Sequence, residues 1–227
     1  MMNRAIRLCW RILPLTMCLA GCATPVSQEE RASTHKIAVV SAIGEKLRVL
    51  NIAPFFINHA DFEVDISSWN IDRRVDNLVT AFLTGKFAVM AVDAKQDYLS
   101  WDAKKLFDDL KTSGRLGDAD TVLVVTRADV INSTIGGLGV LHEVGEDYSR
   151  VFAVYEIDLY RTSDGARIAW SIKPSNSMPS KSIHRNIGSN AMQGQLSADE
   201  MAEVRAALEN VLDESLPSNV QALGLTP

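Results

Sequence analysis

The side chains that could do chemistry in this chain stand singly or in spacings that match no catalytic motif. Gly137-Leu138-Gly139 follows an apolar strand pattern, but the third glycine of a dinucleotide-binding loop is missing and no helix signal follows. His142-Glu143 lacks the second histidine of a zinc-protease helix, because position 146 is Glu146. No Gly-x-Ser-x-Gly elbow occurs. We therefore expect no enzymatic activity, no bound metal and no cofactor.

Paired carboxylates are the remaining candidates, since two such groups can act as general acid and base. Asp108-Asp109 lies beside three lysines on an expected helix, which is typical of a solvated charged face. Glu63 and Asp65 alternate with apolar residues on an expected strand and form its polar face. Both pairs are therefore interpreted as surface charge.

One cysteine lies where a modification is expected. Arg4, Arg7 and Arg11 come first, the apolar run 12–20 follows, and Leu19-Ala20-Gly21-Cys22 closes the segment. A basic stretch, a short apolar stretch and small residues before a cleavage site form the pattern of a secretory signal, too short to span a bilayer stably. An ordinary signal peptide or a membrane-embedded N-terminus, with Cys22 incidental, is the alternative.

Leu19-Ala20-Gly21-Cys22 resembles the lipobox of bacterial lipoproteins. The resemblance implies a signal peptide over 1–21, cleavage before Cys22, and acylation of its thiol and new amino group, so that several acyl chains join the protein to the lipid bilayer. Because Ala23, and not aspartate, follows Cys22, it further implies sorting to the periplasmic face of the outer membrane. The polar stretch 22–34 is then expected to be a flexible tether.

The composition is that of a folded acidic domain. The chain has 227 residues, 47% of them hydrophobic and 22% charged, so 35–227 is expected to form a single periplasmic domain with a sizeable core. Losing three arginines with the signal takes the formal charge from −5 to −8, which disfavours a nucleic-acid partner. Beyond Cys22 the chain has no cysteine, so disulfides and thiolate metal sites are excluded.

Hydrophobic periodicity predicts the elements that would build this domain. Two early strands, 36–42 and 47–53, are expected to form a hairpin around Gly44. Later strands are expected over 62–66, 86–92 and 121–131, with helices after Asn70 and after Ser100. A long surface loop is expected over 174–196, and the capping box Ser197 to Glu200 starts a helix at 198–216 that Pro217 closes.

The strongest strand signal lies in a late hairpin at about 150–172. Val151, Ala153, Tyr155, Ile157 and Leu159 share one parity, which indicates a buried face, and Asp158 lies on the opposite, solvent-facing parity. The predicted fold is α/β or α+β, with a single mixed sheet flanked by three helices, this hairpin and a C-terminal helix.

The hairpin also resembles a known group of envelope proteins. The stretch from Ile157 to Ser171, with Thr162-Ser163-Asp164-Gly165 at its turn and Trp170-Ser171 near its end, is similar to the late hairpin of the TolB N-terminal domain. The curli-secretion lipoprotein CsgG and the lipoprotein activators of penicillin-binding proteins share it, as well as an Ala-Asp pair before an apolar strand, matched here by 118–125. The resemblance covers 70–172 and implies binding or pore formation without catalysis. The strand at 47–53 departs from that pattern.

These observations favour a non-catalytic binding, assembly or regulatory module with an envelope protein partner; a secretion-pore subunit and an envelope hydrolase are the alternatives. The glycine-rich segment 132–149 is the nearest approach to a site, because apolar residues on a permissive loop suit a partner surface. Alternatively, these residues extend the flanking strands or tuck onto the core. The candidate partner-binding residues are Ile135, Leu138, Val140, Leu141 and Val144.

Overall fold

The computed structural model describes residues 23–52, 60–129, 135–172, 178–184, 187 and 195–225. Strands are β1 (Ala23–Thr24), β2 (Lys36–Ala42), β3 (Lys46–Ile52), β4 (Ala60–Asp65), β5 (Ala88–Ala91), β6 (Thr121–Arg127), β7 (Gly137–Glu143), β8 (Ser149–Arg161), β9 (Arg167–Ile172) and β10 (Ser180–Ile183). Helices are α1 (Gln28–Ser33), α2 (Ile71–Leu83), α3 (Ala103–Thr112) and α4 (Ala198–Ala222), and 3-10 turns cover Ser67–Trp69 and Ser100–Asp102. This arrangement confirms the predicted mixed α/β class, the late hairpin and the C-terminal helix.

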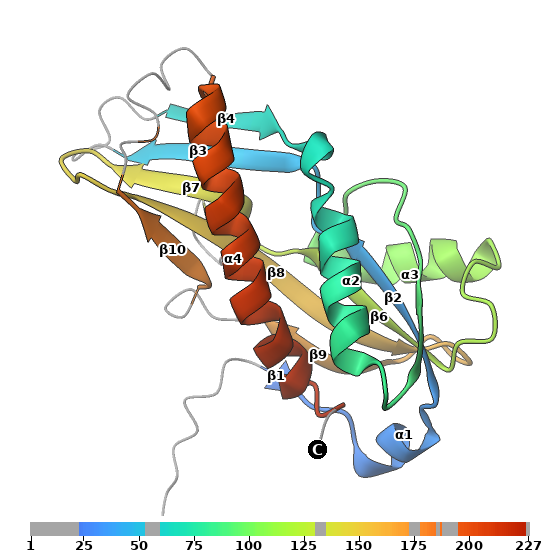
Figure 1. The fold of residues 1–227 in the computed structure, drawn as a ribbon. Helices are drawn as coiled ribbons and strands as arrows, with labels where there is room; N and C mark the ends of the chain where they lie inside the picture. Colours follow the sequence, from blue (N-terminus) through green and yellow to red (C-terminus); the bar gives the residue numbers. More distant parts are fainter. Residues whose placement is uncertain are drawn as a thin grey trace, which may run out of the picture.

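The sheet is organised along β8, whose 13 residues run through its whole length (Figure 1). The C-terminal half of β8 pairs with β6 and β9, and its N-terminal half pairs with β7 and β10, all antiparallel. Parallel to β6 lies β2, followed by β5, while β3 lies parallel to β7, followed by β4. We call the first group, with β1, the lower half-sheet and the second group the upper half-sheet.

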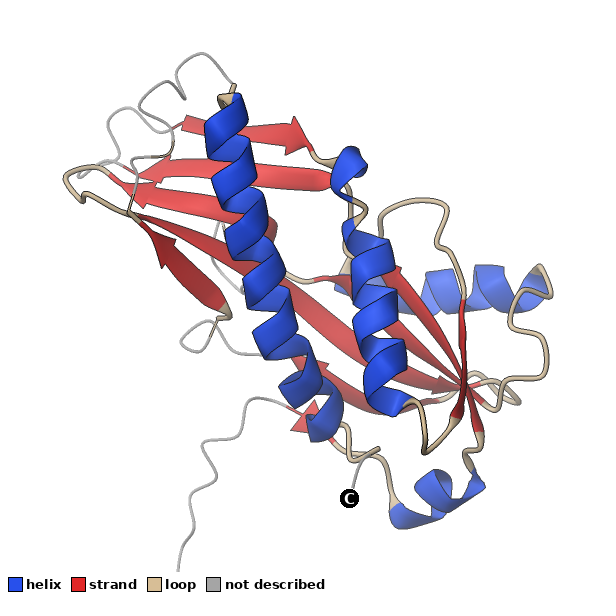
Figure 2. Cartoon of the chain, in the orientation of Figure 1, coloured by secondary structure: helices blue, strands red, loops and turns tan. Residues whose placement is uncertain are grey.

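Helices cover the sheet on both faces. Figure 2 shows α2 and α4 side by side on one face and α3 on the other. Beneath α2 and α4 lies the main core, to which β8 contributes the predicted parity, including Ile157 and Leu159, both fully buried. On the other face, Phe107 of α3 packs with Val122 and Val124 of β6. Arg74 of α2 donates to Asp213 of α4, with 2.7 Å between Nη2 and Oδ2, so the two helices are also joined at the surface.

The predicted hairpin of the first two strands is wrong. At Gly44, whose φ is +108°, the chain turns from β2 in the lower half-sheet into β3 in the upper one, and the two strands do not pair. All residues of β2 from Ile37 onward are buried. A strand covered on both faces belongs in a sheet centre between parallel neighbours, and β2 lies between β5 and β6.

Two more expectations fail near the C-terminus. The expected surface loop 174–196 contains β10, and Ile187 within it is fully buried. The last helix passes Pro217 and continues to Ala222, because Leu216 and Val220 pack into the core. The buried hydroxyl of Tyr155 also holds this part of α4, lying 2.7 Å from Ser215 Oγ and 2.8 Å from Asn219 Nδ2.

Candidate functional site

The segment directly after Cys22 is part of the folded domain. Ala23 and Thr24 form β1, which pairs antiparallel with Ser171 and Trp170 of β9. The next apolar residue, Val26, is buried, and its N–H donates to the carbonyl of Leu223 at 2.8 Å. The sequence predicted a flexible tether here, but from residue 23 onward the structure has an ordered segment. The backbone of this segment pairs with β9, and its buried Val26 packs at the end of α4.

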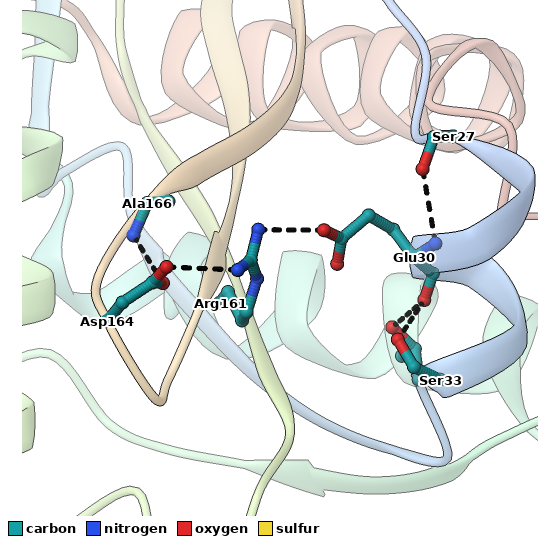
Figure 3. Close-up of polar contacts among 7 residues, drawn as sticks. Ser27, Glu30, Ser33, Arg161, Asp164 and Ala166 are labelled. Carbon is teal, nitrogen blue, oxygen red and sulfur yellow. Dashed lines mark hydrogen bonds and ion pairs between the residues drawn. The ribbon is translucent and has the colours of Figure 1, made fainter.

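The short helix α1 is fixed by its cap and by one arginine (Figure 3). Ser27 caps it, with its hydroxyl oxygen accepting from Glu30 N–H at 3.1 Å. Arg161, at the end of β8, reaches Glu30 with 2.7 Å between Nη2 and Oε1, and Asp164 with 2.9 Å between Nη1 and Oδ2. Exposed pairs of this kind contribute little stability, but together with the backbone contacts they fix where α1 lies.

The structure places the five predicted partner-binding residues in and around a strand, not in an irregular loop. Leu138, Val140 and Leu141 are buried in β7, so they are not presented to a partner in this conformation. Ile135 packs on a small cluster with Phe152 and Val154, and Val144 alone is largely exposed, at 47%. The alternative interpretation, in which these residues extend a flanking strand into the core, matches their observed positions.

Gly139 has a packing role in β7. A Cβ at this position would lie 2.3 Å from the ring of Phe152 and 2.8 Å from the backbone oxygen of Arg48. We predict that Gly139→Ala lowers the free energy of unfolding by about 1–3 kcal/mol, because the ring and the neighbouring strand must both move. Chemical denaturation measures this loss, and an unchanged midpoint would show that the strand is not packed as described.

Buried carboxylates are polar residues of interest that the sequence did not predict. Asp158 is fully buried on the face of β8 toward α3, contrary to the expected solvent-facing position. Arg167 donates to it at 2.9 Å and to Glu156 at 3.2 Å. Burial, followed by repulsion from Glu156, raises the pKa of Asp158 to about 7. The parity was predicted correctly, but α3 and Tyr160 cover the face that the charges suggested was open.

A second pair of carboxylates lies on α2, one turn apart, with Asp76 buried and Asp72 partly buried. Asp72 accepts from the Ser41 hydroxyl at 2.7 Å and from Ile43 N–H at 2.8 Å, and burial raises its pKa. Asp76 is 4% exposed, and within the described part of the chain its Oδ1 has no hydrogen-bond partner. Burial and then the neighbouring Asp72 raise the pKa of Asp76 to about 8. Asn70, expected to cap this helix, does not do so with its side chain, which donates to Ser68 O instead.

A cavity of about 150 Å³ opens where the two half-sheets meet. Lys46, Arg48 and Arg127 line it together with Glu63 and Asp129. Arg48 is already bound to Asp61, with 2.8 Å between Nε and Oδ1, so the charges around the cavity largely compensate one another. Two residues after Leu99, another lining residue, Trp101 is 74% exposed. No sequence motif marks this cavity, because its residues come from distant strands.

Within the described ranges, no three histidine, cysteine or acidic side chains are grouped so that they could hold a metal ion. None of the helices in the same residues is long and apolar enough to cross a membrane. The buried carboxylates and the cavity are separate features of the fold.

No family model matches this chain, and no curated protein matches it. Among solved structures it is similar to a single-residue variant of the PelC dodecamer from Paraburkholderia phytofirmans, with 14% identity, a TM-score of 0.38, and 89% of this chain and 96% of that chain covered. Protein XCC0632 from Xanthomonas campestris gives 14%, 0.39, 91% and 93% for the same quantities. Lipoprotein GNA1162 from Neisseria meningitidis gives 13%, 0.30, 80% and 99%.

Proposed function

We propose that this chain is a bacterial envelope lipoprotein, held by acylated Cys22 at the periplasmic face of the outer membrane. The observation that carries the proposal is Leu19-Ala20-Gly21-Cys22 behind a basic and apolar leader. Several acyl chains on one cysteine give stable anchoring without any membrane-spanning segment.

The domain acts in this proposal as a non-catalytic binding, assembly or regulatory module for an envelope protein. The absence of any catalytic spacing in the sequence supports this class, and so do polar groups that are either buried, as Asp158 and Asp76 are, or mutually compensated around the cavity. Among the described residues, no specific observation favours a pore subunit or a hydrolase.

Affinity purification of the tagged full chain from detergent-extracted native membranes tests this class of function. We expect an envelope protein to co-purify in fixed proportion with the tagged chain and to be lost when the domain is unfolded before capture. A ring-shaped homo-oligomer without such a protein would support a pore subunit instead. Turnover of an envelope polymer by the purified chain would support a hydrolase, and either result would contradict the proposal.

A further inference from the structure

We propose that the anchored domain stands on the bilayer with its β1–α1 end in the headgroup region and α4 pointing away from the membrane. The partner of this end is thus a lipid surface. The inference rests on the proposed function, because it requires an acylated Cys22. It adds an orientation that the lipobox by itself does not contain, since a flexible tether would leave the domain free to turn.

No linker separates the anchor from the fold. Adjacent Cα atoms lie about 3.8 Å apart, so Cys22 is one peptide unit from β1, whose first residue, Ala23, is paired with Ser171. The headgroup layer on one side of a bilayer is about 5–8 Å thick. With the acyl chains of Cys22 in the hydrocarbon, β1 must therefore lie within or directly against the headgroups.

The segment that follows makes contacts with the rest of the domain at several points. It is held at β1 by β9, at Val26 by the carbonyl of Leu223, and at α1 by Arg161. Gly224, next to Leu223, accepts from Arg31 Nη1 at 3.4 Å, and a Cβ added at Gly224 would lie 3.2 Å from Pro25. The end of α4 and the anchor segment therefore form one unit.

The long helix α4 gives the height of the domain above this end. Its 25 residues at 1.5 Å each span about 37 Å. In Figure 1 the C-terminal end of α4 lies near β1, and the helix runs from there across the face of the sheet toward the upper half-sheet. Residues at the start of α4, such as the exposed Asp199, are thus placed several headgroup layers from the bilayer.

An aromatic side chain lies beside the anchor. Trp170 is the register partner of Thr24 and is only partly buried, and the guanidinium of Arg167 lies 5.3 Å from its ring centroid. Tryptophan is enriched at the headgroup level of membranes, where its ring is half in an apolar and half in a wet environment. Thr24, the register partner of Trp170, is two residues from Cys22, so Trp170 is placed where the domain is proposed to contact the headgroups.

Site-directed fluorescence quenching tests the orientation. Cys9 and Cys18 leave with the signal and Cys22 is blocked by its thioether, so one introduced cysteine is the only free thiol. We would label Ala32→Cys on α1 and Asp199→Cys on α4, both at exposed positions, and reconstitute each lipidated protein in phosphatidylcholine vesicles that contain a headgroup-nitroxide lipid. Quenching is expected to be several-fold stronger at position 32 than at position 199.

Lys181→Cys, at an exposed position on β10, controls for a domain that lies on its sheet edge. Stronger quenching at 181 than at 32, or equal quenching at 32 and 199, in protein that carries fatty acid would overturn the orientation while leaving the anchor intact. Protein without fatty acid on Cys22 would overturn the proposed function and the orientation with it. An unchanged melting temperature of each labelled variant in detergent confirms that the fold is retained.

Discussion

Ile157→Ala is expected to lower the free energy of unfolding by about 2–5 kcal/mol, a large part of the stability of an ordinary domain. Ile157 is fully buried at the middle of β8, opposite Val125 of β6 and Ser171 of β9. Truncation removes three carbons from the core between the sheet and α4, and the strands on both sides restrict the collapse of the resulting cavity. Denaturant unfolding followed by circular dichroism measures the loss.

Val144→Ala is the matched control, since Val144 also loses methyl groups but is 47% exposed directly after β7. Its free energy of unfolding should stay within about 0.5 kcal/mol of the unmodified protein. If Ile157→Ala and Val144→Ala unfold at the same denaturant concentration, the side of β8 that faces the core has been assigned wrongly.

The domain is expected to lose stability, by several kcal/mol in the free energy of unfolding, as pH rises from about 4 to about 8. The pKa of buried Asp76 is about 8 and that of Asp158 about 7, both above the ordinary value of 3.8. Between the unfolded and folded pKa values the native state binds more protons than the unfolded state. The stabilisation is therefore complete at low pH and is lost as pH rises through 7 and 8.

Asp76→Asn separates this effect from general alkaline unfolding. An asparagine keeps the shape of the neutral acid, so the variant should match the unmodified protein below about pH 4, exceed it near pH 9 and show a flatter pH profile of melting temperature. The exposed Asp147→Asn should leave the profile unchanged. A profile that stays steep in Asp76→Asn would exclude Asp76 as the titrating group.

Local signals were sufficient for the elements of this fold but not for their pairing. The alternation in β8 and the capping box of α4 arise from neighbouring residues, so the sequence alone predicts them. Whether β3 follows β2 in a hairpin or continues into another half-sheet depends on β7, some 90 positions away, and on how both strands bury their apolar residues. The strand that β3 pairs with is therefore set by tertiary contacts and cannot be predicted from the turn at Gly44.

The candidate sites divide in the same way. Cys22 is recognisable because the lipobox is a contiguous signal, whereas the cavity between the half-sheets is lined by residues from 46 to 138. Asp158 was expected in solvent because charge usually marks the open face of a strand, yet α3 covers it. The stretch after Cys22 was expected to be a tether from its polar composition, which does not reveal that Val26 and Arg161 fix it.

Fatty-acid labelling of Cys22 tests the central claim, that this domain is joined to a membrane through that residue. Cells that express the full chain would be grown with a radiolabelled fatty acid and separated into membrane and soluble fractions. We predict that the unmodified chain carries the label in the membrane fraction and that Cys22→Ser carries none and is released into the soluble fraction. An unlabelled parent chain, or a serine variant that stays fully in the membrane fraction, would contradict the account.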